Sequence, residues 1–382
     1  DCLLSRGLGD VYKRQDVYRG KHEPQKNFFK YALFVSFFPQ LLQGPIGRYE
    51  RLGEQLYEGH AYDLKNIQFG LQRILWGMLK KMVLADRVNA AVTLIFNNYW
   101  NYGGWINVFG VILYSIQLYA DFSGGIDITI GIAQMFGITM DENFRQPYFS
   151  RSIGEFWRRW HITLGTWMKD YIFYPFSLSR CMNKFGKWCK KTFGNNVGKL
   201  LPVSLANLLV FFIVGIWHGA AWKYIMYGMY NGVIIAASGM LAPVYARIHE
   251  SLHINPKSWW YQVFCIIRTF ILVNIGFYFD MAPDLHAANV MLSDTVTKAH
   301  LSQISMATVK AVGLTAQDLI IVAAGCIIIF VVSVLKEKGI KIRETVASRN
   351  IVLRWFIYIV FIMFILIYGS TSTTSDFIYA NF

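Results

Sequence analysis

The chain contains 382 residues, of which 54% are hydrophobic and only 16% are charged. A soluble domain has about 25% charged residues, so this composition excludes an ordinary soluble protein and predicts an all-α polytopic membrane protein. The formal net charge of +14 is explained by cytoplasmic loops and anionic lipid. We therefore expect the lipid bilayer to be a partner and expect no nucleic acid.

The first 15 residues do not fit the rest of the chain. They have no initiator Met, no apolar signal core and no periodicity. We expect residues 1–15 to be a foreign or artefactual segment and residues 16–382 to form a single membrane domain.

Segment 28–47 is apolar but contains Pro39, Gly44 and Pro45. Because Pro removes a backbone donor and clashes with the preceding turn, we predict a broken or re-entrant segment. In segment 67–96, charged residues at positions 80, 81, 86 and 87 interrupt the helical periodicity. This pattern predicts two elements near a membrane interface.

Segment 103–120 is uncharged and long enough to span a bilayer if it is modestly tilted. It continues into Asp121-Phe-Ser-Gly-Gly-Ile-Asp127. The two carboxylates and paired glycines predict a polar bend inside the membrane. The alternative, which we favour for the two carboxylates themselves, is that Asp121 and Asp127 pair with Arg or Lys on another helix.

Segment 153–168 has the pattern of one amphipathic helix, with tryptophans on its apolar face and Arg158 and Arg159 opposite. Trp160 lies on the apolar face and His161 at the border. Such a face is typical of a helix that lies in the membrane interface. The two arginines contact lipid headgroups in the interpretation we favour. In the alternative they attract phosphate or the acidic face of a carrier protein.

Segment 180–199 contains six basic residues and no acidic one, which predicts a cytoplasmic loop. The uncharged runs after it alternate with further polar or basic loops, so that a consistent topology results. The predicted crossings are 200–222, 224–245, 258–279, 319–335 and 355–375.

One imidazole, that of His218, lies near the end of an uncharged span beside Trp217. An ionisable group at such depth is a functional candidate, and the alternative is a buried histidine bonded to a neighbouring helix. Neither His161 nor His218 belongs to a zinc motif, so we expect no metal. A lone imidazole can act as a general base, taking the proton of a hydroxyl as it attacks an acyl carbon.

Two motifs resemble a known family. Phe156-Trp-Arg-Arg-Trp-His161 lies within a longer run that begins at Asn143, and Gly215-Ile-Trp-His-Gly-Ala-Ala-Trp222 comes later in the chain. Both are similar to the membrane-bound O-acyltransferase family, in its bacterial branch for alginate O-acetylation and teichoic acid D-alanylation. Weaker similarities occur at residues 16–21, 38–46, 121–127 and 376–382, so the resemblance covers residues 16–382.

The resemblance implies a ring of tilted, partly broken helices around a central tunnel, with several N-terminal helices absent from this chain. It implies that His218 is the catalytic histidine and that His161 is the second characteristic one. Asn231 departs from the family, whose members often have His there. The candidate substrate-binding residues are Trp217, Trp160, Arg158, Arg159, Asp121 and Asp127.

The function implied is transfer of an acyl group, by preference acetyl, from a cytoplasmic thioester donor to hydroxyls of an extracytoplasmic polysaccharide. The donor is acetyl-CoA or an acyl carrier protein, and no bound cofactor is expected. The resemblance implies an extracytoplasmic acyltransferase or a carrier protein as partner, in the bacterial plasma membrane. The alternatives are D-alanyl transfer to teichoic acid and, from another class, membrane transport.

Overall fold

The structure is a computed structural model. It describes residues 16–18, 20, 23–41, 43–300, 303 and 305–369. Most of these residues lie in helices, and no strand occurs among them. The predicted all-α class is therefore confirmed. The proposed foreign segment 1–15 and the motif at 376–382 lie outside the described residues, and the domain boundary at residue 16 stays a prediction.

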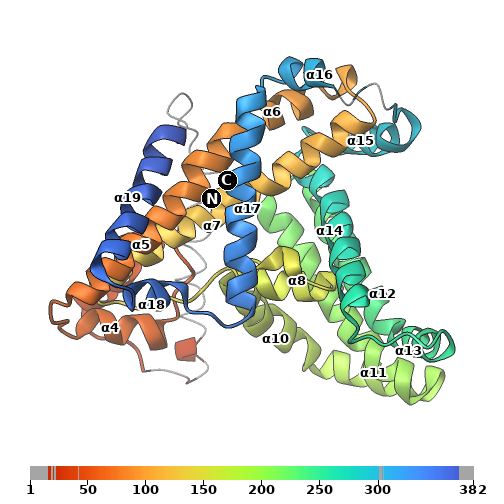
Figure 1. Ribbon diagram of the computed structural model, residues 1–382. Helices are drawn as coiled ribbons and strands as arrows, with labels where there is room; N and C mark the ends of the chain where they lie inside the picture. The colour runs from red at the N-terminus through yellow and green to blue at the C-terminus, as the bar shows by residue number, and fades with distance from the viewer. Residues whose placement is uncertain are drawn as a thin grey trace. The chain divides into compact units, whose positions relative to one another are not determined.

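The chain divides into two compact units. Unit 1 consists of Asp1–Ile95, Val108–Asn143 and His300–Phe382, and unit 2 of Phe96–Asn107 and Phe144–Ala299. Figure 1 shows the helices of both units.

Five helices among the described residues are long and apolar enough to cross a membrane. They are α7 (Trp105–Met135), α11 (Arg180–His218), α14 (Trp259–Met281), α17 (Ala316–Glu337) and α19 (Ile351–Tyr368). A sixth crossing results if α12 (Trp222–Met240) and α13 (Ala242–Ser251), bent by 57° at their junction, form one span. The chain is thus a multi-pass membrane protein, as its composition predicted.

The N-terminal part of unit 1 is broken, as its prolines predicted. Helix α2 (Phe28–Ser36) ends before Phe37, and the short α3 (Phe38–Leu41) begins at once with Pro39 in its first turn. The chain then continues through η1 (Tyr49–Gly53) and α4 (Glu54–Tyr57).

The predicted pair of elements at 67–96 is instead continuous helical structure. Helix α5 (Leu64–Met78) passes into a π-helical stretch, η2 (Leu79–Ala85), and then into α6 (Asp86–Asn97). The charged residues do not interrupt the helix because Lys80 and Lys81 are buried against carboxylates of α7. The opposite side of η2 packs on α17 and α19 through an apolar cluster of Leu79, Val83, Ile321 and Ile365.

The predicted polar bend at 121–127 is wrong, because α7 continues as one helix from Trp105 to Met135. Lys81 Nζ lies 2.6 Å from Asp121 Oδ1, and Lys80 Nζ lies 2.5 Å from Asp127 Oδ2. The favoured alternative, pairing with basic residues on another helix, is therefore confirmed. Close approach of α5 to α7 supports these pairs: a Cβ on Gly77 would lie 2.5 Å from the carbonyl oxygen of Gly124.

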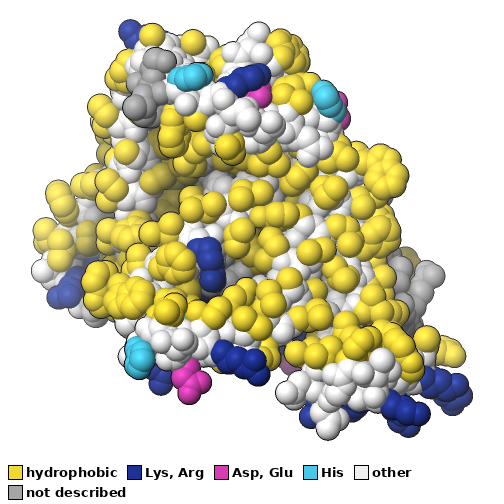
Figure 2. Space-filling model, turned by 90° about the vertical axis from the view of Figure 1, so that its right-hand side faces the viewer, with side chains coloured by type: hydrophobic (Ala, Val, Ile, Leu, Met, Phe, Trp, Pro, Cys, Tyr) yellow, Lys and Arg dark blue, Asp and Glu magenta, His cyan; other side chains and the backbone are white. Residues whose placement is uncertain are grey.

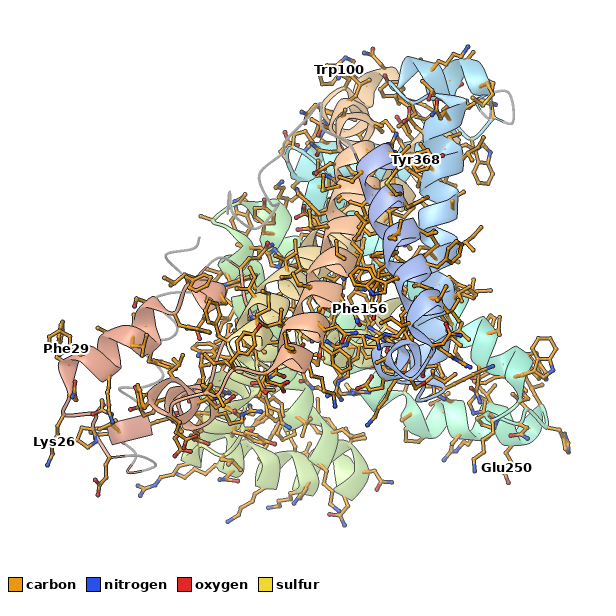
Figure 3. The ribbon with its side chains drawn as sticks, turned by 60° about the vertical axis from the view of Figure 1, so that its left-hand side comes forward. Lys26, Phe29, Trp100, Phe156, Glu250 and Tyr368 are labelled. Atoms are coloured by element: carbon orange, nitrogen blue, oxygen red, sulfur yellow. The ribbon has the colours of Figure 1, made fainter. Side chains whose placement is uncertain are left out.

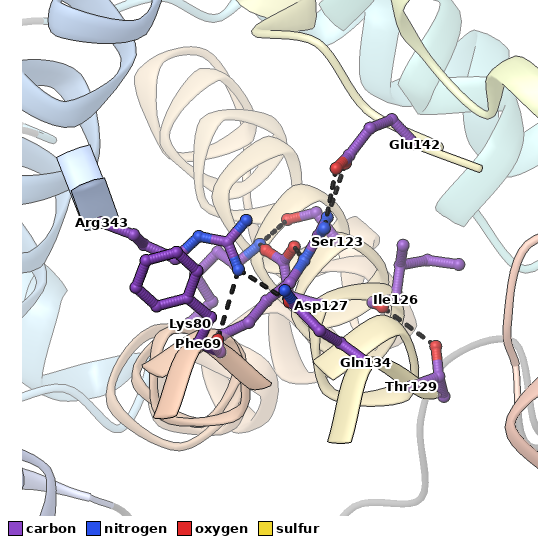
Figure 4. Close-up of polar contacts among 10 residues, drawn as sticks. Phe69, Lys80, Ser123, Ile126, Asp127, Thr129, Gln134, Glu142 and Arg343 are labelled. Carbon is purple, nitrogen blue, oxygen red and sulfur yellow. Dashed lines mark hydrogen bonds and ion pairs between the residues drawn. The ribbon is translucent and has the colours of Figure 1, made fainter. Parts of the chain in front are cut away.

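Figure 4 shows polar contacts around Lys80 and Asp127 in unit 1. Arg73 contacts Asp127 at 2.8 Å and Glu142 at 2.5 Å. Arg343, in the short helix α18 (Ile342–Ala347), donates hydrogen bonds to the backbone oxygen of Phe69 and to the side chain of Gln134. Helix α16 (Met306–Ala311) completes the described helices of this unit.

The predicted basic loop at 180–199 is helical, because α11 begins at Arg180. The helix reverses at Gly194, whose φ of 81° and ψ of 171° are non-helical. Glycine suits this position because residues with a side chain rarely adopt such a φ. The two arms then lie close together, since a Cβ on Gly198 would be 2.4 Å from Lys190 Cα.

In unit 2 the later part of α11 packs on α12, and α12 packs on α14. Smaller elements complete the unit: η3 (Tyr99–Asn101), η4 (Pro147–Phe149), α8 (Ile153–Arg159), α9 (Ile162–Met168), η5 (Lys169–Phe173), α10 (Tyr174–Ser177) and α15 (Leu285–Thr297). Figure 2 shows a face on which hydrophobic side chains predominate, with most Lys and Arg toward its lower edge. Exposed side chains such as Trp259 and Ile271 lie on the membrane-crossing helix α14, where lipid is their expected surrounding.

Candidate active site

His218 is the last residue of α11, and only 6% of its surface is exposed. The next residue, Gly219, has a φ of 148° and ends the helix. A Cβ at Gly219 would lie 2.7 Å from the ring of Tyr224, so a larger residue would disturb this corner. The imidazole is thus placed where a long apolar helix stops and the chain turns back into α12.

Small residues bring α12 against the end of α11. A Cβ on Gly215 would lie 2.6 Å from the backbone oxygen of Tyr224, and one on Gly228 would lie 2.2 Å from that of Phe211. These distances are far below normal van der Waals contact, so both positions require glycine. The close packing places the aromatic side chains of α12 around His218.

Three aromatic rings surround the His218 imidazole. The ring centroids of Trp217, Tyr227 and Tyr224 lie 5.0, 5.4 and 6.0 Å from that of His218. These contacts limit rotation of the imidazole and exclude water from most of its surface. A base in such surroundings meets its substrate with little competition from bulk solvent.

The predicted single helix at 153–168 is wrong. It is two short helices, α8 and α9, which are separated at Trp160 and His161. His161 precedes α9 with φ 45° and ψ 54°, in the left-handed region that few residues other than glycine adopt. Strain of this kind gathers at functional sites, and the hydrophobic pattern alone could not reveal it.

The break directs His161 toward the other histidine. Its ring centroid lies 5.9 Å from that of Trp217, which in turn contacts His218. Burial, together with the charge of His218, lowers the pKa of His161 to about 3. His161 is therefore neutral at physiological pH. The structure brings together in unit 2 the two histidines that the sequence identified.

The tryptophans of α8 face the protein. Trp160 is 3% exposed and packs on Phe144 and Phe156. Figure 3 marks Phe156, which is 1% exposed. Trp157 donates a hydrogen bond of 3.0 Å to Asn231 of α12. This apolar face therefore forms part of the core of unit 2, and the expected position of the segment in the membrane interface stays a prediction.

The two arginines of α8 that were predicted to bind substrate differ in their surroundings. Arg158 is exposed, whereas Arg159 lies 2.9 Å from Glu155 Oε1. Burial would raise the pKa of Glu155, but a hydrogen bond from the Arg151 N–H and the charges of Arg159 and Arg151 lower it below its usual value. Their predicted roles in substrate binding stay predictions.

Asp121 and Asp127 belong to unit 1, where they form ion pairs with Lys81 and Lys80. Buried ion pairs with several cations account for both carboxylates without a substrate. Their place in substrate binding therefore has no support from geometry.

Sequence reasoning missed one acidic residue beside His218. Asp280, in the last turn of α14, is 5% exposed, and its Oδ1 lies 3.7 Å from His218 Nδ1. Lys223 Nζ donates to the backbone oxygens of Asp280 and Ala282, at 3.3 and 2.7 Å. The available signal was an acidic residue directly after an apolar span, a position that the hydropathy pattern assigns to a polar loop.

Comparison with known proteins decides the family. A sequence model of the membrane-bound O-acyltransferase family matches residues 21–279. A probable alginate O-acetylase, AlgI, from Pseudomonas syringae pv. tomato is 34% identical over 278 residues, or 72% of this chain. The chain belongs to the membrane-bound O-acyltransferase family. This membership confirms the resemblance seen in the two histidine motifs.

Relatives within the membrane-bound O-acyltransferase family differ in their named acceptors. A peptidoglycan O-acetyltransferase of Helicobacter pylori is 33% identical over 72% of this chain and 49% of its own length. A teichoic acid D-alanyltransferase of Bacillus subtilis is 30% identical over 74% of this chain and 68% of its own. The chain spans about half the length of the acetylase relatives, 48% for the Pseudomonas syringae protein.

Proposed function

We propose that the protein is a plasma-membrane O-acyltransferase that moves an acetyl group from a cytoplasmic thioester to hydroxyls of an extracytoplasmic polysaccharide. The observation that supports this most is the placement of His218. It is a buried imidazole at the end of an apolar helix, with His161 and Asp280 nearby in the same unit. Membership of an O-acyltransferase family supports the same reaction.

In this reaction an acceptor hydroxyl approaches a nitrogen of His218. The imidazole takes the hydroxyl proton as the oxygen forms a bond to the acyl carbon. The carbon–sulfur bond then breaks, and the thiolate leaves with the proton that His218 returns. Since a thiolate leaves readily, positioning and deprotonation of the alcohol are the main tasks of the site. The aromatic surroundings suppress hydrolysis of the thioester by excluding water.

The donor we propose is acetyl-CoA or an acyl carrier protein, used as a substrate. The predicted partners are a cell-envelope polysaccharide and an extracytoplasmic acyltransferase or carrier protein. The names of the acetylase relatives, for alginate and for peptidoglycan, support an acetyl group and leave the polymer open.

A second candidate is D-alanyl transfer to teichoic acid. It is supported by the Bacillus subtilis D-alanyltransferase, which is 30% identical over 74% of this chain. Transport, the alternative from another class, loses its support once the chain belongs to an acyltransferase family.

Deletion of the complete gene in its host tests the proposal. Envelope polymers are treated with mild base, and the released acetate and D-alanine are quantified with and without complementation. Loss of ester-linked acetate supports the proposal, and loss of D-alanine supports the second candidate. If neither ester decreases in a strain without a related gene, both assignments are wrong.

A further inference from the structure

The carboxylate of Asp280 faces Nδ1 of the His218 ring. In a mechanism with one base, the other ring nitrogen, Nε2, is the one that meets the reacting hydroxyl. His218 Nδ1 and Asp280 Oδ1 are 3.7 Å apart, and the two side chains are buried, with 6% and 5% of the residue surface exposed. A carboxylate taken out of water is costly unless other groups compensate it. Its burial against an imidazole therefore calls for an explanation beyond packing.

Lys223 holds the backbone on which Asp280 lies. Its ammonium donates to the backbone oxygens of Asp280 and Ala282 just where α14 ends, and it also interacts electrostatically with the Asp280 carboxylate. Capping of these terminal carbonyls by a cation stabilises a helix end. Helix α12 thus provides two of the three aromatic rings around His218 and the cation that fixes Asp280.

A carboxylate beside Nδ1 determines the tautomer of a neutral histidine. The single N–H is most stable on the nitrogen that faces the carboxylate, which leaves the lone pair on Nε2. The same negative charge stabilises the imidazolium that forms when Nε2 accepts a proton. The separation of 3.7 Å exceeds a hydrogen bond by about 0.5 Å. Catalytic contacts are often this long before substrate binds.

We propose that Asp280 is a positioning residue, which keeps the proton of neutral His218 on Nδ1 and so presents Nε2 to the acceptor hydroxyl. This inference rests on the proposed function, because it assigns a role within the same reaction. Asp280 itself touches neither donor nor acceptor, and it acts through His218.

The test uses membrane vesicles of the host that contain the complete gene product, with radiolabelled acetyl-CoA as donor and the envelope polymer as acceptor. The variants are Asp280→Asn, Asp280→Glu, His218→Gln and the double variant of Asp280→Asn with His218→Gln. Asp294→Asn is the matched control, because Asp294 is also buried in unit 2 but pairs with Lys298 at 2.8 Å.

We expect Asp280→Asn to lower kcat about 100-fold, with the KM for acetyl-CoA changed less than about threefold. Asp280→Glu, which keeps the carboxylate, restores part of this loss. In the His218→Gln background, Asp280→Asn lowers the residual rate less than about twofold, because the two residues act as a unit. A merely structural role would instead lower the rate by the same factor in both backgrounds, and Asp294→Asn would resemble Asp280→Asn.

The experiment distinguishes failure of the proposed function from failure of the role assigned to Asp280. If wild-type vesicles form no ester either from acetyl-CoA or from an acetylated acyl carrier protein, or if His218→Gln keeps the full rate, the proposed function fails and this inference falls with it. If His218→Gln is inactive while Asp280→Asn keeps its kcat, the proposed function stands and only the role of Asp280 is wrong.

Discussion

Trp157 and Asn231 join α8 to α12 through a hydrogen bond of 3.0 Å from the indole nitrogen to the amide oxygen. The Asn231 amide nitrogen in turn donates to the backbone oxygen of Tyr227, one of the residues around His218. Asn231 is 3% exposed, so its polar atoms depend on these partners. The residue that departs from the family pattern has a structural role here.

Loss of this hydrogen bond should destabilise the protein. We expect Asn231→Ala to lower the free energy of unfolding by about 1–3 kcal/mol, because it leaves the Trp157 N–H without its acceptor. Trp157→Phe removes the donor and keeps most of the ring, so its effect and that of Asn231→Ala should not add. Unfolding in detergent measures both. Fully additive effects would contradict a direct interaction.

The packing of α11 on α12 gives a prediction with a control in the same helix. We expect Gly228→Ala to cost about 1–3 kcal/mol or more, because the new Cβ would lie 2.2 Å from the Phe211 backbone oxygen. Gly239→Ala should be neutral or stabilising, since nothing lies within 4 Å of its Cβ. Thermal unfolding of the two variants measures this difference. Equal destabilisation by both would contradict the close approach of α11 and α12.

The ion-pair cluster of unit 1 should depend strongly on Asp127. Asp127→Ala leaves Lys80 and Arg73 without this carboxylate, and we expect a loss of about 3–5 kcal/mol. Asp141→Ala is the control, because its partner Arg51 is 61% exposed and such pairs contribute less than about 1 kcal/mol. Resistance to unfolding by denaturant in detergent compares them. Similar behaviour of the two variants would mean that the buried pair is not required.

Stability should fall on acidification because of His161. Burial and the charge of His218 lower its pKa to about 3 in the folded protein, whereas an unfolded histidine titrates near about 6.5. Between these values the unfolded state binds more protons, so stability rises with pH and is lost as pH falls below about 6.5. Denaturation midpoints measured at neutral pH and at two acidic pH values give the slope of stability against pH. His161→Gln should reduce it, and an unchanged slope would show that His161 does not cause it.

Composition and apolar runs were sufficient to predict the membrane class and most crossings. Helices α14 and α17 lie within a few residues of the predicted spans. What sequence periodicity could not give was the partner of each charge. Asp127 was predicted to pair with a basic residue on another helix, but the sequence did not identify Lys80 and Arg73 as the residues that neutralise it. Long-range pairs of this kind leave no local pattern.

The candidate site, too, was predicted only in part from the sequence. His218 and His161 were found because an imidazole in an apolar segment is unusual at any position. Asp280 was missed because aspartate after a span is common, and only folding places it near His218. The break before α9 was missed because the hydrophobic pattern continues across His161 while its backbone turns left-handed.

The most direct test of the central claim compares two histidine variants of the complete gene product in its host. We expect His218→Gln to lower the base-labile ester of the envelope polymer at least about 100-fold, the contribution expected of a general base. His249→Gln is the control, because His249 contacts Tyr261 on α14 rather than the residues around His218; it should keep the wild-type ester content. Wild-type ester content in His218→Gln, at equal protein level and without a related gene, would contradict the account.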